Sequence, residues 1–233
     1  MRIVVNHVTR MTGSRICVAG IETATYRHVR PVTGRTDPLT RALLREHGGP
    51  FGAGALVDIG RVMAVPNAPE MEDHEFEVRR AKRVSDIDGG TYLELLTAMR
   101  AADLGSAFGP ELERVSRTYA VEPGTGGSSL AVLRAEKRPV FEINEYGELR
   151  LWYNDVEPPA YLSVKDVRFF EEDQKTIKTS AVDDVSRRLS QGVEAFLMLG
   201  LTRPWLKPGE TRERHWLQLN GLCLADRAVG DIP

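Results

Sequence analysis

Two short segments of the sequence place rings and cations side by side, and this pattern has the clearest chemical meaning. Successive residues of a strand point to opposite faces, so Tyr26, His28 and Arg30 are expected on one side and Arg27 on the other. Flat rings beside a fixed cation suit stacking on bases and holding a phosphate. We therefore predict nucleic-acid contacts through these four side chains and through Arg15, a further cation upstream.

The second segment reads as a hairpin over residues 141–153 that turns through Gly147, a residue that tolerates positive φ. Strand alternation then places Arg150 and Trp152 together on one face. The opposite, buried face is expected to consist of Phe141, Ile143, Leu149 and Leu151. Arg150 and Trp152 complete the predicted nucleic-acid contacts. The alternative is structural: Trp152 and Tyr26 pack against a neighbouring domain or helix.

Patterns typical of common enzymes are missing from the sequence. The five histidines do not have the spacing of helical zinc ligands, and no Cys-x-x-Cys occurs. No Gly-x-Ser-x-Gly nucleophile elbow is found, and Ser128 and Ser129 stand in a Gly-rich run that reads as a flexible tether. We predict no catalytic residue, no metal ligand and no cofactor.

A metal-dependent nuclease is the weaker alternative for function. Such enzymes hold Mg²⁺ against a phosphate with several carboxylates, usually beside a lysine. Asp58 and Glu77 imitate this set only loosely, because Arg79 stands where the lysine is expected and Asp58 belongs to an otherwise apolar strand.

Charge is unevenly distributed along a chain of ordinary composition. Of 233 residues, 42% are hydrophobic and 27% charged, which excludes extended disorder and a disulfide scaffold, and the net charge is only −2. Residues 1–36 carry six arginines against one acid, whereas residues 70–77 carry five acids. The basic segment favours an anionic partner. The acidic run is expected to be a solvated strand edge, or else the surface through which an adaptor docks a protein partner.

The compartment is predicted from what the sequence lacks. The longest apolar stretches are too short to cross a bilayer, and the first residues have no signal-peptide pattern. Cys17 and Cys223 are expected as buried thiols of a reducing compartment. The prediction is a cytoplasmic protein without a membrane partner.

Secondary structure is predicted to be mainly β, with a few helices. Strand-length segments rich in β-branched residues end in Gly, Pro, Asn or Asp. They cover residues 3–5, 16–18, 27–32, 56–62, 75–78, 130–133, 139–143, 148–153, 161–170, 193–202 and 214–224. Helices are expected over residues 91–103, from Pro110 onward, and over residues 182–190.

Two domains are expected, with the boundary in the Gly/Ser/Pro-rich residues 122–129. About five short strands in each half indicate two small β-barrels in tandem. The first would span residues 1–122, with a helical insertion near 91–117, and the second would span residues 130–233.

Several segments resemble the dual OB-fold (DuOB) domain family of prokaryotes. The most specific are Cys17-Val18-Ala19-Gly20 and Arg30-Pro31-Val32, and the later stretches 56–59, 161–166, 196–202 and 216–221 are also similar. His28 stands where the family commonly has an aromatic residue, often Trp, and Lys165 where it commonly has Thr.

That resemblance implies two OB-like barrels that bind nucleic acid, often in prokaryotic defence or mobile-element systems. It supplies no catalytic residues. Together with the aromatic and basic segments, it leads to the prediction of a non-catalytic protein that binds single-stranded or structured DNA or RNA.

Overall fold

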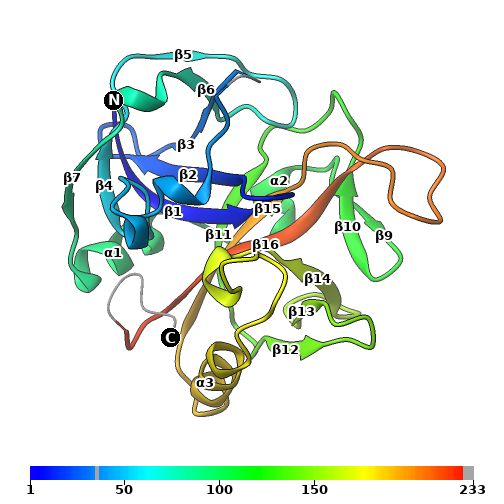
Figure 1. Ribbon diagram of the computed structural model, residues 1–233. Coiled ribbons are helices and arrows are strands. Elements are labelled where there is room, and N and C mark those ends of the chain that lie inside the picture. Colours follow the sequence, from blue (N-terminus) through cyan, green and yellow to red (C-terminus); the bar gives the residue numbers. More distant parts are fainter. Residues whose placement is uncertain (35–36, 228–233) are drawn as a thin grey trace.

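The computed structural model describes residues 1–34 and 37–227 of the chain. It is mainly β, with 41% strand and 18% helix, as the sequence predicts. Two curled sheets lie side by side, and one of them forms a half-barrel (Figure 1). Among the described residues, no helix combines the length and the apolar character needed to span a membrane.

The first sheet has seven strands in the order β5-β6-β3-β2-β1-β4-β7. Its neighbours are antiparallel except for the parallel pair β3–β6. The strands are β1 (Arg2–Arg10), β2 (Ile16–Glu22), β3 (His28–Val32), β4 (Ala55–Asp58), β5 (Val62–Ala64), β6 (Asp73–Phe76) and β7 (Lys82–Asp86). Short 3₁₀ turns interrupt its connections at η1 (Arg41–Leu43), η2 (Arg45–His47) and η3 (Val78–Arg80).

The second sheet has nine strands, with the main order β12-β13-β14-β16-β15-β11-β8, while β10 pairs with β16 and β9. The strands are β8 (Arg100–Ala101), β9 (Glu113–Val115), β10 (Thr118–Val121), β11 (Leu130–Arg134), β12 (Val140–Ile143), β13 (Leu149–Tyr153), β14 (Ala160–Val164), β15 (Ala195–Leu201) and β16 (His215–Leu224). Strand pairing therefore passes from the first sheet to the second between Asp86 and Arg100, upstream of residues 122–129.

Three α-helices and a further 3₁₀ turn accompany the sheets: α1 (Gly89–Met99), α2 (Leu104–Phe108), α3 (Thr179–Ser190) and η4 (Val167–Phe169). Asp88 caps α1 by accepting from Thr91 N. The helix expected from Pro110 is wrong. Asp103 and Ser106 form a capping box that starts α2 earlier, and Gly109, at φ 86°, ends it before the proline.

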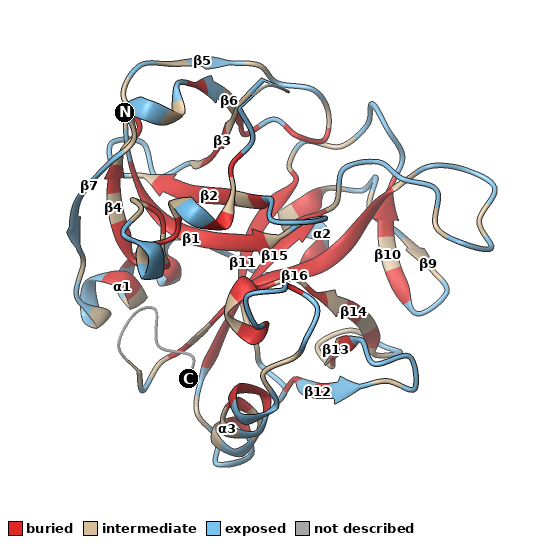
Figure 2. Cartoon of the chain, viewed as in Figure 1, coloured by how far each residue is buried: buried red, intermediate tan, exposed pale blue. Residues whose placement is uncertain are grey.

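The two sheets share buried apolar contacts. Val4 and Ile21 of the first sheet pack with Val132 and Met198 of the second, and Tyr92 of α1 closes the cluster. Figure 2 shows the central strands β1, β2, β15 and β16 as the buried middle of the molecule. β1 also reaches the second sheet directly, because Arg10 N donates to Lys165 O at 2.8 Å. This junction is where the candidate site lies.

Candidate nucleic-acid interface

A cleft with a cavity volume of about 480 Å³ opens where the two sheets meet. One wall comes from β1 and β2, and the other from β15, β16 and the segment that follows β15. Residues 173–175, in the loop before α3, form a third side. The volume lies in the range of roughly 300–1,000 Å³ that is usual for ligand pockets.

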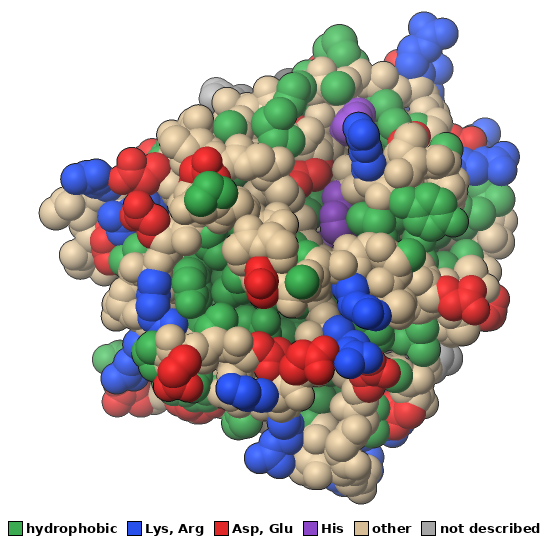
Figure 3. Space-filling model, turned by 180° about the vertical axis from the view of Figure 1, so that it is seen from behind, with side chains coloured by type: hydrophobic (Ala, Val, Ile, Leu, Met, Phe, Trp, Pro, Cys, Tyr) green, Lys and Arg blue, Asp and Glu red, His purple; other side chains and the backbone are tan. Residues whose placement is uncertain are grey.

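The lining of this cleft is strongly positive. Its ionisable side chains include five cations and a single carboxylate, that of Asp173. The cations are Arg10, Arg30, Lys165, Lys175 and Arg203. Seen from behind, the surface instead mixes acidic and basic side chains (Figure 3). Arg30 and Arg203 are paired with carboxylates behind the wall, so Arg10, Lys165 and Lys175 are the lining cations without an ion pair in the described chain, and they are the ones that can attract an anion.

Lys165 and Arg10 are half-buried at this site, and the carboxylates that act on them, Glu148 on both and Asp173 on Arg10, lie beyond ion-pair distance. Neither forms an ion pair in the part of the chain that the structure describes, although Arg10 donates to the backbone oxygen of Gln174 and lies over the Phe170 ring. Burial lowers the pKa of Lys165 to about 8, and the charges of Arg10 and Arg150 act in the same direction. Burial also lowers the pKa of Arg10. An anion bound here would relieve the repulsion among these cations.

Neutral polar groups line the deeper part of the cleft. His7 is 1% exposed, and burial, helped by His28 and Arg30, holds its pKa well below the ordinary value, so its ring is neutral. Gln218 Nε2 donates to Asn220 Oδ1 at 2.7 Å on β16. A Cβ at Gly200 would collide with the Asn220 amide, so the glycine leaves space for this side chain.

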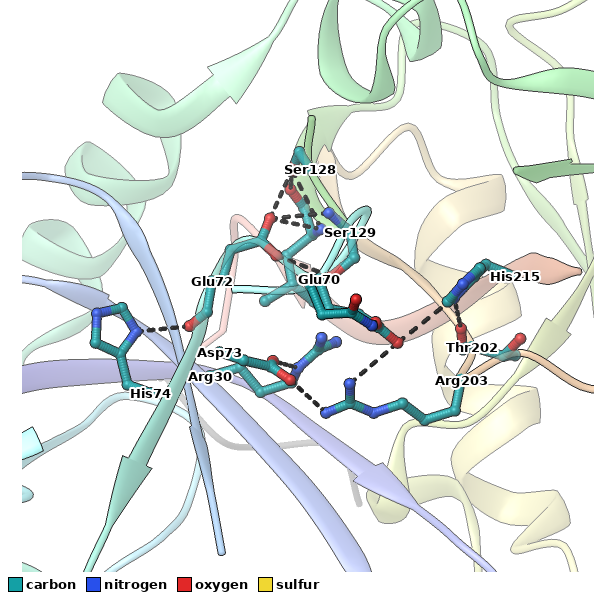
Figure 4. Close-up of polar contacts among 12 residues, drawn as sticks. Arg30, Glu70, Glu72, Asp73, His74, Ser128, Ser129, Thr202, Arg203 and His215 are labelled. Carbon is teal, nitrogen blue, oxygen red and sulfur yellow. Dashed lines mark hydrogen bonds and ion pairs between the residues drawn. The ribbon is translucent and has the colours of Figure 1, made fainter. Parts of the chain in front are cut away.

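A buried ionic network supports one wall of the cleft (Figure 4). Asp73 accepts from Arg30 Nε at 2.5 Å and from Arg203 Nη2 at 2.7 Å. Arg203 also pairs with Glu70 at 3.0 Å, and Glu70 lies 3.5 Å from His215 Nδ1. The network joins β3 and β6 of the first sheet to the second sheet, which fixes the position of Arg203.

Glu72 makes a second connection between the sheets. Its carboxylate accepts from Ser128 Oγ, Ser129 N and Ser129 Oγ at 2.7–2.9 Å. Figure 4 shows both serines turned toward this carboxylate. The interpretation of Ser128 and Ser129 as a flexible tether is therefore wrong, because a buried carboxylate holds them next to β11.

The expected solvated edge at residues 70–77 is also wrong in part. Glu70, Glu72 and Asp73 are 1%, 8% and 5% exposed, since their charges face the networks just described. Only Glu75 and Glu77 of the five acids are exposed. Burial leaves the acidic run little surface with which to dock a protein partner.

The first sequence-predicted segment does not form one exposed face. Tyr26 is exposed but lies in a turn with φ 55°, and β3 begins only at His28. Arg30 is 3% exposed and bound to Asp73, so the expectation that it contacts phosphate at the surface is corrected. Arg15 and Arg27 are exposed, and Arg15 Nε donates to Thr12 O at 3.3 Å. Arg35 of the basic segment lies outside the described residues.

His28 occupies a more enclosed place than a stacking platform requires. Its ring meets that of His7 edge to face at 5.4 Å, and burial lowers its pKa to about 4. Its Nε2 lies 3.4 Å from Asn6 Nδ2. His28 therefore packs behind the cleft wall.

The second predicted segment has the expected alternation. Leu149 and Leu151 are buried, while Arg150 and Trp152 lie on the opposite face of β13, and the hairpin turns at Gly147 with φ 71°. Ile143, expected in the core, is 43% exposed near the end of the edge strand β12. Edge strands have no neighbour to cover their last residues.

Trp152 and Arg150 have neighbours of their own. The Trp152 ring packs against that of Tyr161, with centroids 4.5 Å apart and planes tilted by 41°, and its Nε1 donates to Glu142 Oε2 at 2.6 Å. Arg150 donates to Ser163 Oγ at 2.6 Å and pairs with Glu148. Trp152 therefore contacts adjacent strands of its own sheet, and these contacts involve neither the helix nor the neighbouring domain of the structural alternative.

The Arg150 face leads toward the cleft. Cross-strand pairing aligns Arg150 with Ser163, Ser163 with Gln218, and Gln218 with Gly200. One polar row therefore runs from Arg150 on β13 through Ser163 to Gln218 on β16, which lines the cleft. This places Arg150 beside the cations of the cleft, which sequence reasoning did not anticipate.

Sequence reasoning missed several residues of the cleft itself: His7, Arg10, Lys165, Lys175, Arg203 and Trp205. They come from three distant stretches of the chain, and the sheets bring them together. One local signal existed, since Lys165 is a cation at the end of a strand that otherwise alternates between buried and half-buried residues.

The residues considered for a nuclease do not form a metal site. Asp58 accepts from Gly60 N at 2.9 Å and faces the N-terminal amino group, whereas Glu77 pairs with Arg80. Within residues 1–34 and 37–227, the one group of three side chains spaced to hold a cation is exposed and consists of Glu46, His47 and Glu172.

Comparison of the chain with protein families, with curated proteins and with solved structures gave no match.

Proposed function

We propose that this protein binds single-stranded or structured nucleic acid without cleaving it, and that the cleft between the sheets is its main binding site. The observation that carries the proposal is that three of the cleft's five cations, Arg10, Lys165 and Lys175, have no ion pair among the described residues, while the lining holds one carboxylate, that of Asp173. Phosphates are the anions that nucleic acids present in a row, and Lys and Arg are the residues that neutralise them.

Aromatic groups at the cleft support a nucleic-acid ligand over a simple anion. Trp205 is 43% exposed and lines the cleft next to Arg203. The polar row through Arg150 extends the path away from the cleft, toward the stacked Trp152 and Tyr161. Cations that follow a path with rings beside it are the usual arrangement for a single strand. We further propose that the two curled sheets act as two OB-like barrels that share this path.

The test is the salt dependence of binding to a labelled single-stranded oligonucleotide, measured by fluorescence anisotropy. Contact with four to six phosphates gives a slope of log affinity against log salt of roughly −3 to −4. The double variant Lys165→Met with Lys175→Met should make the slope shallower by about 1.4. The matched control is Lys82→Met with Lys137→Met, which removes two exposed lysines outside the cleft.

A flat salt response, or equal effects of both double variants, would overturn the cleft as the binding site. Co-purification of a protein partner without nucleic acid would instead favour the adaptor alternative. Cleavage of labelled DNA or RNA with Mg²⁺, lost in Asp58→Ala, would favour the nuclease.

A further inference from the structure

The deep part of the cleft holds buried hydrogen-bonding groups that have no partner in the described chain. Both ring nitrogens of His7 lack a hydrogen bond, as do Arg30 Nη2 and Gln174 Oε1. These residues are 1%, 3% and 3% exposed, and all three line the cleft. Leaving a buried polar group unsatisfied costs roughly 1–3 kcal/mol. Several such groups on residues that line one cleft indicate a place where a polar ligand could satisfy them.

The chemistry of these groups specifies what the ligand must offer. A neutral imidazole has one donor and one acceptor, Arg30 Nη2 is a donor and Gln174 Oε1 is an acceptor. A ligand that satisfies them needs both donors and acceptors on a compact, rigid edge. The edge of a nucleic-acid base has this mixture, and a phosphate, which is an acceptor, does not.

The other end of the cleft suits a phosphate. Arg10 and Lys165 lie on neighbouring chain segments joined by a backbone hydrogen bond, and Lys175 is exposed at the same opening. Lys165 and Lys175 have no acidic partner within 4 Å in the described chain. The single cleft therefore combines a neutral polar interior with a cationic entrance.

Apolar side chains also line the cleft. Cys17, Ala19, Leu130 and Leu201 line the cleft, and Trp205 stands at its rim. Burial raises the pKa of the Cys17 thiol, so it lines the cleft as a neutral apolar group. Such surfaces suit the flat faces of a base.

We infer that the cleft accepts one unpaired nucleotide, with its base inserted between the sheets toward His7 and its phosphate at Arg10 and Lys165. This inference rests on the proposed function and narrows it: the ligand is a strand with at least one unstacked base, read by hydrogen bonds at its edge. A fully paired duplex cannot supply such a base without extruding it.

Calorimetric titration tests the inference with small probes: the four nucleoside 5′-monophosphates, ribose 5-phosphate and inorganic phosphate. Base insertion requires that at least one monophosphate bind about tenfold or more tightly than ribose 5-phosphate. His7→Phe keeps a ring of similar shape but removes both nitrogens. This variant should reduce the preference for the monophosphate over ribose 5-phosphate to less than about threefold, and the affinity for ribose 5-phosphate should change little. Lys165→Met should weaken all phosphorylated probes, and Lys82→Met should leave them unchanged.

The outcomes separate this inference from the function on which it rests. If ribose 5-phosphate binds as well as every monophosphate, or none binds with Kd below about 1 mM, base insertion is overturned. A salt-dependent affinity for the oligonucleotide would then still support nucleic-acid binding at the surface. If neither the preference for a monophosphate nor the salt-dependent affinity for the oligonucleotide is seen, base insertion and the proposed function are both overturned. If the thermal melt shows that His7→Phe does not fold, the same comparison can be made in the unmodified protein with oligonucleotides that each contain one abasic nucleotide. Base insertion predicts a loss of affinity at one abasic position at least. If affinity is unchanged at every abasic position, insertion is overturned.

Discussion

Arg30 and Asp73 lie opposite each other in the parallel strands β3 and β6, and the guanidinium donates to the carboxylate at 2.5 Å in the interior. The second oxygen of Asp73 binds Arg203, which follows β15 of the other sheet. One carboxylate therefore holds two arginines, one from each side of the cleft. The buried charges of Arg30 and Asp73 therefore position the cleft wall and do not face the solvent.

Removing the charge of Asp73 should destabilise the protein strongly. Asp73→Asn leaves Arg30 buried without a counter-charge, and breaking a buried pair in this way costs about 3–5 kcal/mol. Urea unfolding measures the loss. Glu75→Gln on the same strand is the control, because Glu75 is exposed, and it should change stability by less than about 0.5 kcal/mol. Similar effects of the two variants would contradict this role of Asp73.

Much of the fold could be predicted from strand alternation, and the exceptions have physical causes. β13 shows the buried and half-buried alternation that its sequence predicts. β7 was missed because it is an exposed edge strand, so its sequence has no apolar face. The helix expected at Pro110 is absent because the capping signal at Asp103 starts α2 upstream.

The site was less predictable than the fold. Alternation applied to Tyr26 failed because a turn with positive φ precedes β3. The cationic character of residues 1–36 did point to an anion, but only Arg10 and Arg30 of that segment line the cleft. Lys165 and Arg203 join them through the contact between sheets, and no local pattern encodes that contact.

Glu72 should prove important for the segment before β11. Glu72→Gln places an amide NH₂ where one carboxylate oxygen accepts hydrogen bonds, so donors from Ser128 and Ser129 lose an acceptor. Hydrogen bonds to charged groups contribute about 1.5–3 kcal/mol, and we expect a loss in that range. Limited proteolysis should also cut residues 122–129 faster. Unchanged cleavage and unchanged urea unfolding would show that the carboxylate does not hold this segment.

Binding of an anionic ligand should weaken above pH 8. Lys165 in the free protein has its pKa lowered to about 8, so it loses its proton as the pH rises through that value. Because the ligand binds the charged form, affinity should fall about fivefold between pH 8 and pH 9. Anisotropy titrations across this range measure the fall. The fall in affinity should persist in Lys82→Met and disappear in Lys165→Met. If the fall persists in Lys165→Met, another group is responsible for it.

Acid should destabilise the protein through its buried histidines. The pKa of His28 is lowered to about 4 in the folded state from about 6.5, and burial also holds the pKa of His7 well below its ordinary value. Between these values the unfolded chain binds more protons, so stability is complete above pH 6.5 and is lost as the pH falls toward 4. His28→Gln should flatten the curve of unfolding free energy against pH by about 1–3 kcal/mol over this window. An unaltered curve would place the titrating group elsewhere.

Trp205 and Trp152 should differ in what they contribute to binding. Trp205 is 43% exposed at the cleft, so a base can stack on it, and Trp205→Ala should weaken oligonucleotide binding by about 1–3 kcal/mol. Trp152 already packs against Tyr161 and donates to Glu142, so Trp152→Ala should mainly lower the melting temperature. Anisotropy and thermal unfolding of both variants separate the two roles. A larger loss of affinity in Trp152→Ala, with its melt intact, would instead place the strand on the outer face of β13, where the sequence first indicated it.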